Sequence, residues 1–184
     1  MTNRRFRFTH KDQGGFTLIE LIVAIAIAAL ITAGITAAIM QVLTINTRAS
    51  NHMVAVRQVQ QAGKEVSKDT LQAQSVNATG SWGFPLILTW TEWGTNNTHT
   101  VDYTLEERPG GVVRLQRGHS VNGGNSTVTT VAEYIDGNID PATTKAKTRC
   151  EWDAADRVLV FTVTATLGTE SETRIYDIDQ RVDP

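Results

Sequence analysis

The 184-residue chain has few residues that would crosslink or kink it. Its one cysteine, Cys150, excludes an intramolecular disulfide framework. None of its 4 prolines precedes Pro85, so no proline interrupts the first 84 residues. A domain outside the cytoplasm would therefore depend on its hydrophobic core, for which the roughly 130 residues after the N-terminal region suffice.

Charge is absent from one long stretch near the N-terminus. Residues 21–45, LIVAIAIAALITAGITAAIMQVLTI, contain no charged side chain. A helix of this length would span about 37 Å, whereas the hydrocarbon core of a bilayer is about 30 Å thick. We therefore expect one membrane-spanning helix. The Ala-x-Ala spacing at Ala24 and Ala26 leaves signal-peptidase cleavage as an alternative, although the apolar stretch continues well beyond it.

The remaining charge is unevenly distributed. Four cations and one carboxylate give the first 15 residues a net charge of +3, which leaves −5 for the others because the whole chain carries −2. Under the positive-inside rule, the N-terminus stays in the cytoplasm and the C-terminal region crosses the membrane. An acidic domain lacks the clustered cations that bind phosphates, so no nucleic-acid partner is expected.

Glu20 stands at the start of the apolar stretch, in the sequence GGFTLIE at residues 14–20. A carboxylate costs about 2.5–3.5 kcal/mol at the centre of a membrane helix and less near its edge. Glu20 is thus either an interfacial charge without consequence or a group kept for a cationic partner.

A basic leader ends at Gly15, Phe16 follows, and Glu20 is the fifth residue after that junction. This pattern resembles the N-terminal signature of bacterial type IV prepilins and type II secretion pseudopilins. The resemblance implies that a prepilin peptidase cuts between Gly15 and Phe16 and that Phe16 is then N-methylated. It also implies that Glu20 neutralises the N-terminal amine of a neighbouring subunit, which would set the register of assembly.

The same resemblance implies a structural protein, not an enzyme, that is a subunit of a type IV pilus or type II secretion pseudopilus. Its partners would be other pilin or pseudopilin subunits, the prepilin peptidase, an inner-membrane assembly platform and membrane lipid. It would cross the bacterial inner membrane once before joining a cell-surface pilus or periplasmic pseudopilus. Small residues at Ala24, Ala28 and Gly34 would let apolar helices pack closely. The alternative is a membrane-tethered binding or adhesin domain that does not polymerise.

Beyond Arg48 the sequence becomes polar but keeps an apolar stripe at helical spacing, which predicts one packed face. We expect one helix from Phe16 to about Gln74. The members of the stripe are Val56, Val59, Gly63, Val66, Thr70 and Ala73.

Alternating runs then predict strands at 86–92, 100–106, 112–117, 157–167 and 172–180, with turns at 107–111 and 167–170. The expected fold is α+β and pilin-like, with the long helix packed on an antiparallel sheet. Only 118–127 and 136–147 read as poorly ordered.

Four segments follow: a cleaved leader at 1–15, the transmembrane half of the helix at 16–47, its amphipathic half at 48–76, and a sheet domain at 77–184. This order of elements is similar to that of larger minor pilins and J-type minor pseudopilins, which favours a minor subunit.

Asp136, Asn138 and Asp140 have the spacing of the first ligands of a calcium loop. An EF-hand would continue with glycine and a twelfth-position glutamate, where this chain has Pro141 and Lys147. A turn rich in Asx side chains is the favoured interpretation, with a calcium site as the lesser alternative. No other metal and no other cofactor is expected.

The remaining candidates point to packing. Trp90 and Trp93 should lie on opposite faces of a strand, one in the core and one available for contacts. Cys150 should be a small buried hydrophobe. His10, His52, His99 and His119 lack metal-binding spacing, so solvated or capping roles are expected.

Overall fold

The computed structural model describes residues 15–109 and 111–180, so residues 1–14 of the predicted leader, His10 included, lie outside the described residues. One long helix precedes an antiparallel sheet, and the predicted α+β class is confirmed. The elements are α1 (Leu18–Gln72), β1 (Ser75–Asn77), β2 (Leu86–Thr91), β3 (Thr98–Glu107), β4 (Val113–Val121), β5 (Thr127–Ile135), β6 (Arg149–Asp153), β7 (Val158–Leu167) and β8 (Glu170–Asp179).

The chain divides into two compact units, of which the first ends at Ile45 and the second begins at Asn46. The described part of the first unit is the N-terminal portion of α1, whose side chains are all exposed. The second unit contains the rest of α1 and all the described strands.

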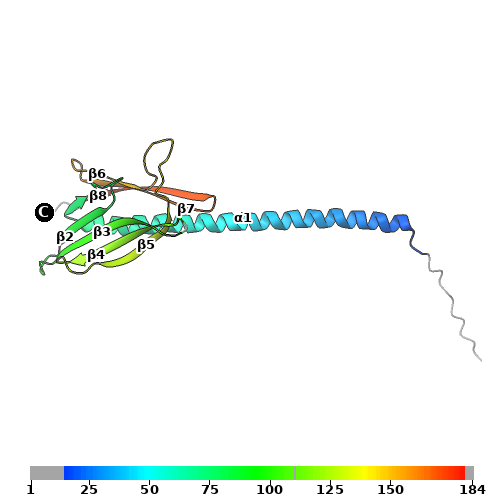
Figure 1. Ribbon diagram of the computed structural model, residues 1–184, viewed down its shortest axis with the longest axis horizontal. Helices are drawn as coiled ribbons and strands as arrows, with labels where there is room; N and C mark the ends of the chain where they lie inside the picture. The colour runs from blue at the N-terminus through cyan, green and yellow to red at the C-terminus, as the bar shows by residue number, and fades with distance from the viewer. Residues whose placement is uncertain (1–14, 110, 181–184) are drawn as a thin grey trace, which may run out of the picture. The chain divides into compact units, whose positions relative to one another are not determined.

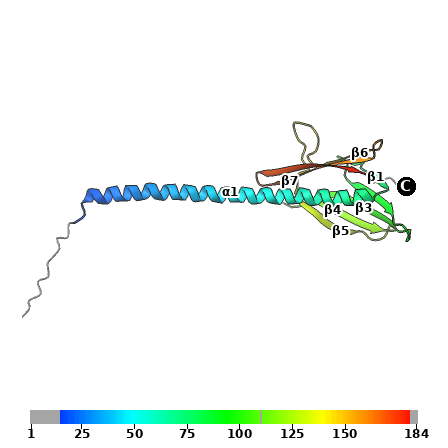
Figure 2. The same cartoon turned by 180° about the vertical axis from the view of Figure 1, so that it is seen from behind.

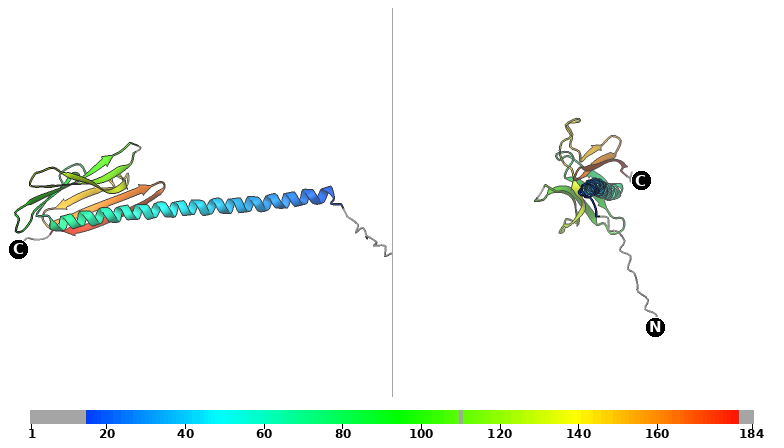
Figure 3. Two further views of the ribbon diagram at one scale, coloured as in Figure 1. Left: turned by 90° about the horizontal axis from the view of Figure 1, so that it is seen from below. Right: turned by 90° about the vertical axis from the view of Figure 1, so that its right-hand side faces the viewer.

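The sheet of the second unit curls around its part of α1. Strands β1 to β5 pair in sequence order, and β5 then meets β7 through Ile135 and Ala165. β7 also pairs with β6 and, along its whole length, with β8. β2–β5 lie on one side of the helix and β6–β8 on the other (Figures 1 and 2). The end-on view in Figure 3 shows the helix between these two groups of strands.

The core lies between the helix and the inner face of the sheet. The helix contributes mainly small and β-branched side chains, so the strands approach it closely, while the strands contribute the larger ones. Burying each large apolar side chain stabilises the fold by about 1.5–3 kcal/mol. The largest fully buried apolar and aromatic side chains of the core are Tyr103, Phe161, Leu86, Leu88, Leu115 and Leu159.

Two contacts fix the C-terminal strand against the helix. The ring of Tyr176 occupies the space above Gly63, and the Tyr176 hydroxyl donates to the Val59 carbonyl at 3.1 Å. Gln180 is 5% exposed, and its amide nitrogen donates to the Ala73 carbonyl at 3.0 Å, where the helix has ended. These bonds satisfy polar groups that would otherwise be buried without partners.

The structure differs from the sequence expectations at several elements. The five predicted strands are present with shifted ends, but β1, β5 and β6 were not predicted. The prediction of poor order at 118–127 is wrong for 118–121, which complete β4, and for Thr127, which starts β5. The segment 136–147 contains a bridge between Ile139 and Ala146, so its poor order is also contradicted.

Candidate functional site at the leader junction

The predicted cleavage junction lies in a short non-helical segment directly before α1. Gly15, Phe16 and Thr17 have no regular secondary structure, and the helix begins at Leu18. Phe16 is 91% exposed, and Gly15 is exposed as well. Exposed chain outside regular structure is the preferred substrate of proteolysis, and the Gly15–Phe16 bond has both properties.

Thr17 and Glu20 form a capping box at the start of the helix. The Thr17 backbone N–H and hydroxyl donate to Glu20 Oε2 at 2.9 and 2.8 Å, and the Glu20 N–H donates to Thr17 Oγ1 at 3.4 Å. The carboxylate therefore has local donors within its own chain. The sequence analysis missed this role, although the T-x-x-E spacing before an apolar run is a recognised signal for it.

The helix after this cap is long and apolar enough to cross a membrane, by its length and composition. Ala24, Ala28 and Gly34 are exposed along it. Thr32 and Thr36 each donate a hydroxyl to the carbonyl four residues earlier, at 2.8 and 2.9 Å. These bonds give each hydroxyl a partner within the helix, as apolar surroundings without water would require.

The family model of the prokaryotic N-terminal methylation motif matches residues 10–36. The chain carries the prepilin-type leader signature. The signature includes Gly15, Phe16 and Glu20 and extends into α1 as far as Thr36. No curated protein and no solved structure matches the chain. The prepilin signature thus identifies the N-terminal segment. Cleavage, methylation, charge pairing by Glu20 and helix packing through Ala24, Ala28 and Gly34 stay predictions.

Asp136, the first residue of the predicted calcium loop, pairs with a cation of the chain itself. Asp136 Oδ2 lies 2.7 Å from Lys147 Nζ, and Asp136 Oδ1 accepts from the Asn138 backbone and side-chain amides at 3.0 and 2.8 Å. Burial raises the pKa of Asp136, but the hydrogen bonds from Lys147 and Asn138 outweigh it, so the pKa lies below its usual range. Asp140 instead accepts from the Ala142 N–H and the Thr143 hydroxyl.

In the described ranges, no three His, Cys, Asp or Glu side chains converge in a way that would hold a metal ion. Calcium binding by Asp136, Asn138 and Asp140 stays a prediction, and a rise in melting temperature at millimolar calcium is its test.

Sequence reasoning also missed a polar cluster on the helix-facing side of β2, β3 and β4. Asp69 is 2% exposed on α1 and binds both Arg117 and the Tyr103 hydroxyl. The expectation that His99 and His119 have solvated or capping roles is wrong. Their rings are half-buried, and His99 Nδ1 lies 3.0 Å from His119 Nε2.

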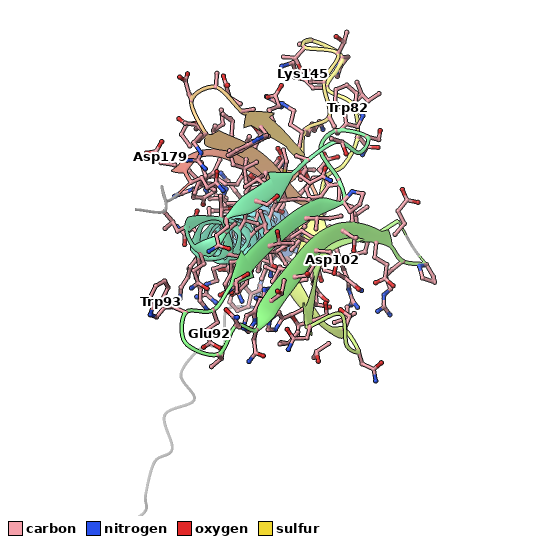
Figure 4. All side chains as sticks on the ribbon, turned by 90° about the vertical axis from the view of Figure 1, so that its left-hand side faces the viewer. Trp82, Glu92, Trp93, Asp102, Lys145 and Asp179 are labelled. Carbon is pink, nitrogen blue, oxygen red and sulfur yellow. The ribbon has the colours of Figure 1, made fainter. Side chains whose placement is uncertain are left out.

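Trp90 stacks on this histidine pair. Its ring centroid lies 5.3 Å from that of His99, at an interplanar angle of 3°. Trp93 is fully exposed, as expected of one of the two tryptophans, but it lies in the turn after β2. Figure 4 shows Trp93 and Trp82 at separate places on the surface of the sheet unit. These two exposed tryptophans therefore do not form one aromatic patch.

Proposed function

We propose that the chain is the precursor of a structural subunit of a type IV pilus or type II secretion pseudopilus. The observation that carries this proposal is the methylation motif at residues 10–36, with the Gly15–Phe16 bond exposed ahead of a long apolar helix. The motif implies assembly with other pilin subunits and processing by the prepilin peptidase. Membrane anchoring through the apolar helix agrees with it.

The capping box suggests how Glu20 changes partners. In the precursor, the carboxylate accepts from the backbone and hydroxyl of Thr17. Cleavage after Gly15 creates an amine on Phe16, one residue before the cap. In a filament, the Glu20 carboxylate of one subunit would neutralise the amine of the next. A buried charge is tolerated when it is paired and hydrogen-bonded, so only the axial offset that pairs both groups would be stable.

The orientation and the abundance of the subunit belong to the same proposal. The basic N-terminus would remain cytoplasmic, and the sheet unit would end in a surface pilus or periplasmic pseudopilus. The inner-membrane assembly platform and membrane lipid would be further partners. We retain the minor subunit as the proposed role, because the order of elements is similar to that of J-type pseudopilins.

Intact-mass spectrometry of the chain from membranes and from sheared surface filaments tests the proposal. The expected species begins at N-methylated Phe16 and is present in the sheared fraction, where its stoichiometry separates a major from a minor subunit. A chain that retains residues 1–15, or one cut within or after the apolar helix, would contradict assembly by the prepilin route.

The non-polymerising adhesin remains the second candidate because Trp93 is fully exposed. It predicts surface display that does not depend on the assembly motor or the prepilin peptidase. Loss of display when either is deleted would exclude it.

A further inference from the structure

One tryptophan of the sheet unit lies wholly outside its core. Trp93 is 100% exposed, in the loop that joins β2 to β3. Figure 4 shows its side chain projecting away from the sheet, with Glu92 in the same loop. A tryptophan buries about 150–250 Å² when it packs, so an indole left entirely in water has its faces free for a ligand.

The loop that carries Trp93 is fixed by its own hydrogen bonds. The Glu92 N–H donates to the Asn97 carbonyl at 2.8 Å and closes the loop. The Thr95 hydroxyl donates to Glu92 Oε2 at 2.6 Å and accepts from the Asn97 N–H at 3.3 Å. Gly94 supplies a left-handed position, with φ at 92°. The backbone of Trp93 is therefore held in place before a ligand arrives, which lowers the entropy cost of binding.

An open hollow of about 490 Å³ lies beside the indole, and polar side chains form most of its wall. Gln74 Oε1 accepts from the Thr91 N–H at 3.0 Å, which leaves the Gln74 amide nitrogen as a free donor. Glu92 Oε1 and the Asn96 side-chain amide also have no hydrogen-bond partner among the described residues. The hollow thus combines one aromatic face with free donors and acceptors. The described residues that line it are Gln74, Thr91, Glu92, Trp93, Gly94 and Asn96.

We infer that this hollow binds a neutral hexose, either free or at the end of a glycan. A pyranose ring has a face of C–H groups, which packs on the indole, and a rim of hydroxyls that both donate and accept hydrogen bonds. The donors on Gln74 and Asn96 and the acceptor on Glu92 suit that rim. A few polar groups placed around an apolar contact are the usual composition of a small-molecule site.

The same lining argues against other ligands. A nucleotide or an acidic sugar needs a cation for its phosphate or carboxylate, and the one charged group among the described lining residues is the carboxylate of Glu92. A protein partner needs a wider apolar surface, whereas Trp93 is the one large apolar side chain among those residues. The inference goes beyond the proposed function and does not depend on it, because the loop belongs to the sheet unit and not to the leader or the apolar helix.

Saturation-transfer NMR of the full chain in detergent tests the site. The probes are the methyl glycosides of galactose, glucose and mannose, with N-acetylneuraminic acid as the anionic control. The detergent has no sugar headgroup, because an alkyl maltoside would compete. We expect transfer to the ring C–H protons on one face of at least one hexoside, with a Kd of about 1 mM, and none above background to the anionic control.

A second arm of the experiment separates the two sources of the sugar. Oligosaccharides that end in the bound hexose are compared with its methyl glycoside. Tighter binding of the oligosaccharide would support the site and assign it to a glycan chain. Equal binding would support the site and assign it to the single sugar.

Substitutions in the loop supply the matched variants. Trp93→Ala should weaken binding at least tenfold because the stacking face is lost, while Trp93→Tyr should retain most of it. Trp82→Ala is the control, because Trp82 is 40% exposed at a separate place on the sheet unit (Figure 4). Asn96→Gly removes the amide, tolerates the positive φ of 55°, and should weaken binding about fivefold. The fully exposed Trp93 should be replaceable without a change in melting temperature, which separates lost binding from lost folding.

Three results would overturn the inference: no transfer to any of the three hexosides, transfer that Trp93→Ala leaves unchanged, or equal transfer to N-acetylneuraminic acid. Failure of the proposed function is read separately, as a wild-type chain that is uncleaved or missing from sheared filaments. That failure would leave sugar binding by the purified chain unchanged.

Discussion

Asp69 on α1 and Arg117 on β4 form a two-pronged ion pair, with Asp69 Oδ2 2.6 Å from Arg117 Nε and Oδ1 3.1 Å from Nη2. The Tyr103 hydroxyl donates to the same Oδ2 at 2.6 Å. Burial, followed by the negative charge of Asp69, raises the pKa of Tyr103 well above its usual range, so this hydroxyl remains a donor. The hydrogen bonds that Arg117 donates to Asp69 likewise raise the pKa of Arg117.

Removing one member of this pair should strongly destabilise the sheet unit. Asp69→Ala leaves Arg117 largely buried without a carboxylate, which costs about 3–5 kcal/mol in the free energy of unfolding. Thermal or denaturant unfolding of the full chain in detergent measures the loss. Asp156→Ala is the control, because Asp156 is exposed in a turn and should change little. Equal stability of the two variants would show that the buried pair is not a stabilising link.

A methyl group at Gly63 should force β8 away from the helix. A Cβ built there overlaps the ring of Tyr176, so Gly63→Ala requires the ring to move. Overpacking of this kind costs about 1–3 kcal/mol, and replacing Tyr176 with leucine in the same chain should recover part of it. Gly34→Ala, with no atom within 4 Å of its Cβ, should leave the melting temperature of the sheet unit unchanged. If both alanine variants melt at the wild-type temperature, the close packing of Tyr176 is wrong.

Stability should fall as the pH drops below about 6.5, the usual pKa of histidine. Burial, and then the charge of Arg117, lowers the pKa of His119 in the folded state. As the pH falls, the unfolded chain therefore binds a proton at this histidine before the folded chain does. The free energy of unfolding decreases between about pH 6.5 and the lowered pKa of His119. Melting temperatures between pH 7.5 and 5 should show this slope, and His119→Gln should reduce it. His52→Gln, on the exposed part of α1, should retain it.

Cys150 should be inert in the folded chain. It is 3% exposed, and burial raises its pKa well above the usual range, so little thiolate forms at neutral pH. A thiol reagent such as Ellman's should label it only after denaturation. Rapid labelling of the native chain would place Cys150 in an accessible position instead.

The sequence predicted those parts of the fold whose signals are local and periodic. The apolar stripe from Val59 to Ala73 is buried as expected, because helical spacing alone determines which side chains share a face. The prepilin-type leader was likewise predicted from spacing between Gly15, Phe16 and Glu20, and the motif match confirms that signature.

The missed elements lack such a local signal. β5 begins with Thr127-Val128-Thr129-Thr130, all exposed, so no alternation distinguishes it from a loop. Asp69 is a charged residue between buried positions of a helix, and only the register of β3 and β4 places Tyr103 and Arg117 beside it. The pairing of His99 with His119 depends on the same register, which no spacing within one segment reveals.

The last described residue bears on the order in which the chain can fold. Gln180 bonds to Ala73 across 107 positions of sequence, and Tyr176 bonds to Val59 across 117. A ribosome synthesises the chain from its N-terminus, so α1 emerges long before the strand that covers Gly63. These long-range contacts cannot form before their C-terminal partners have been synthesised. The sheet unit therefore cannot complete its fold until nearly the whole chain has been made. The apolar half of α1 can therefore be complete while the region behind it is still an unfolded polypeptide.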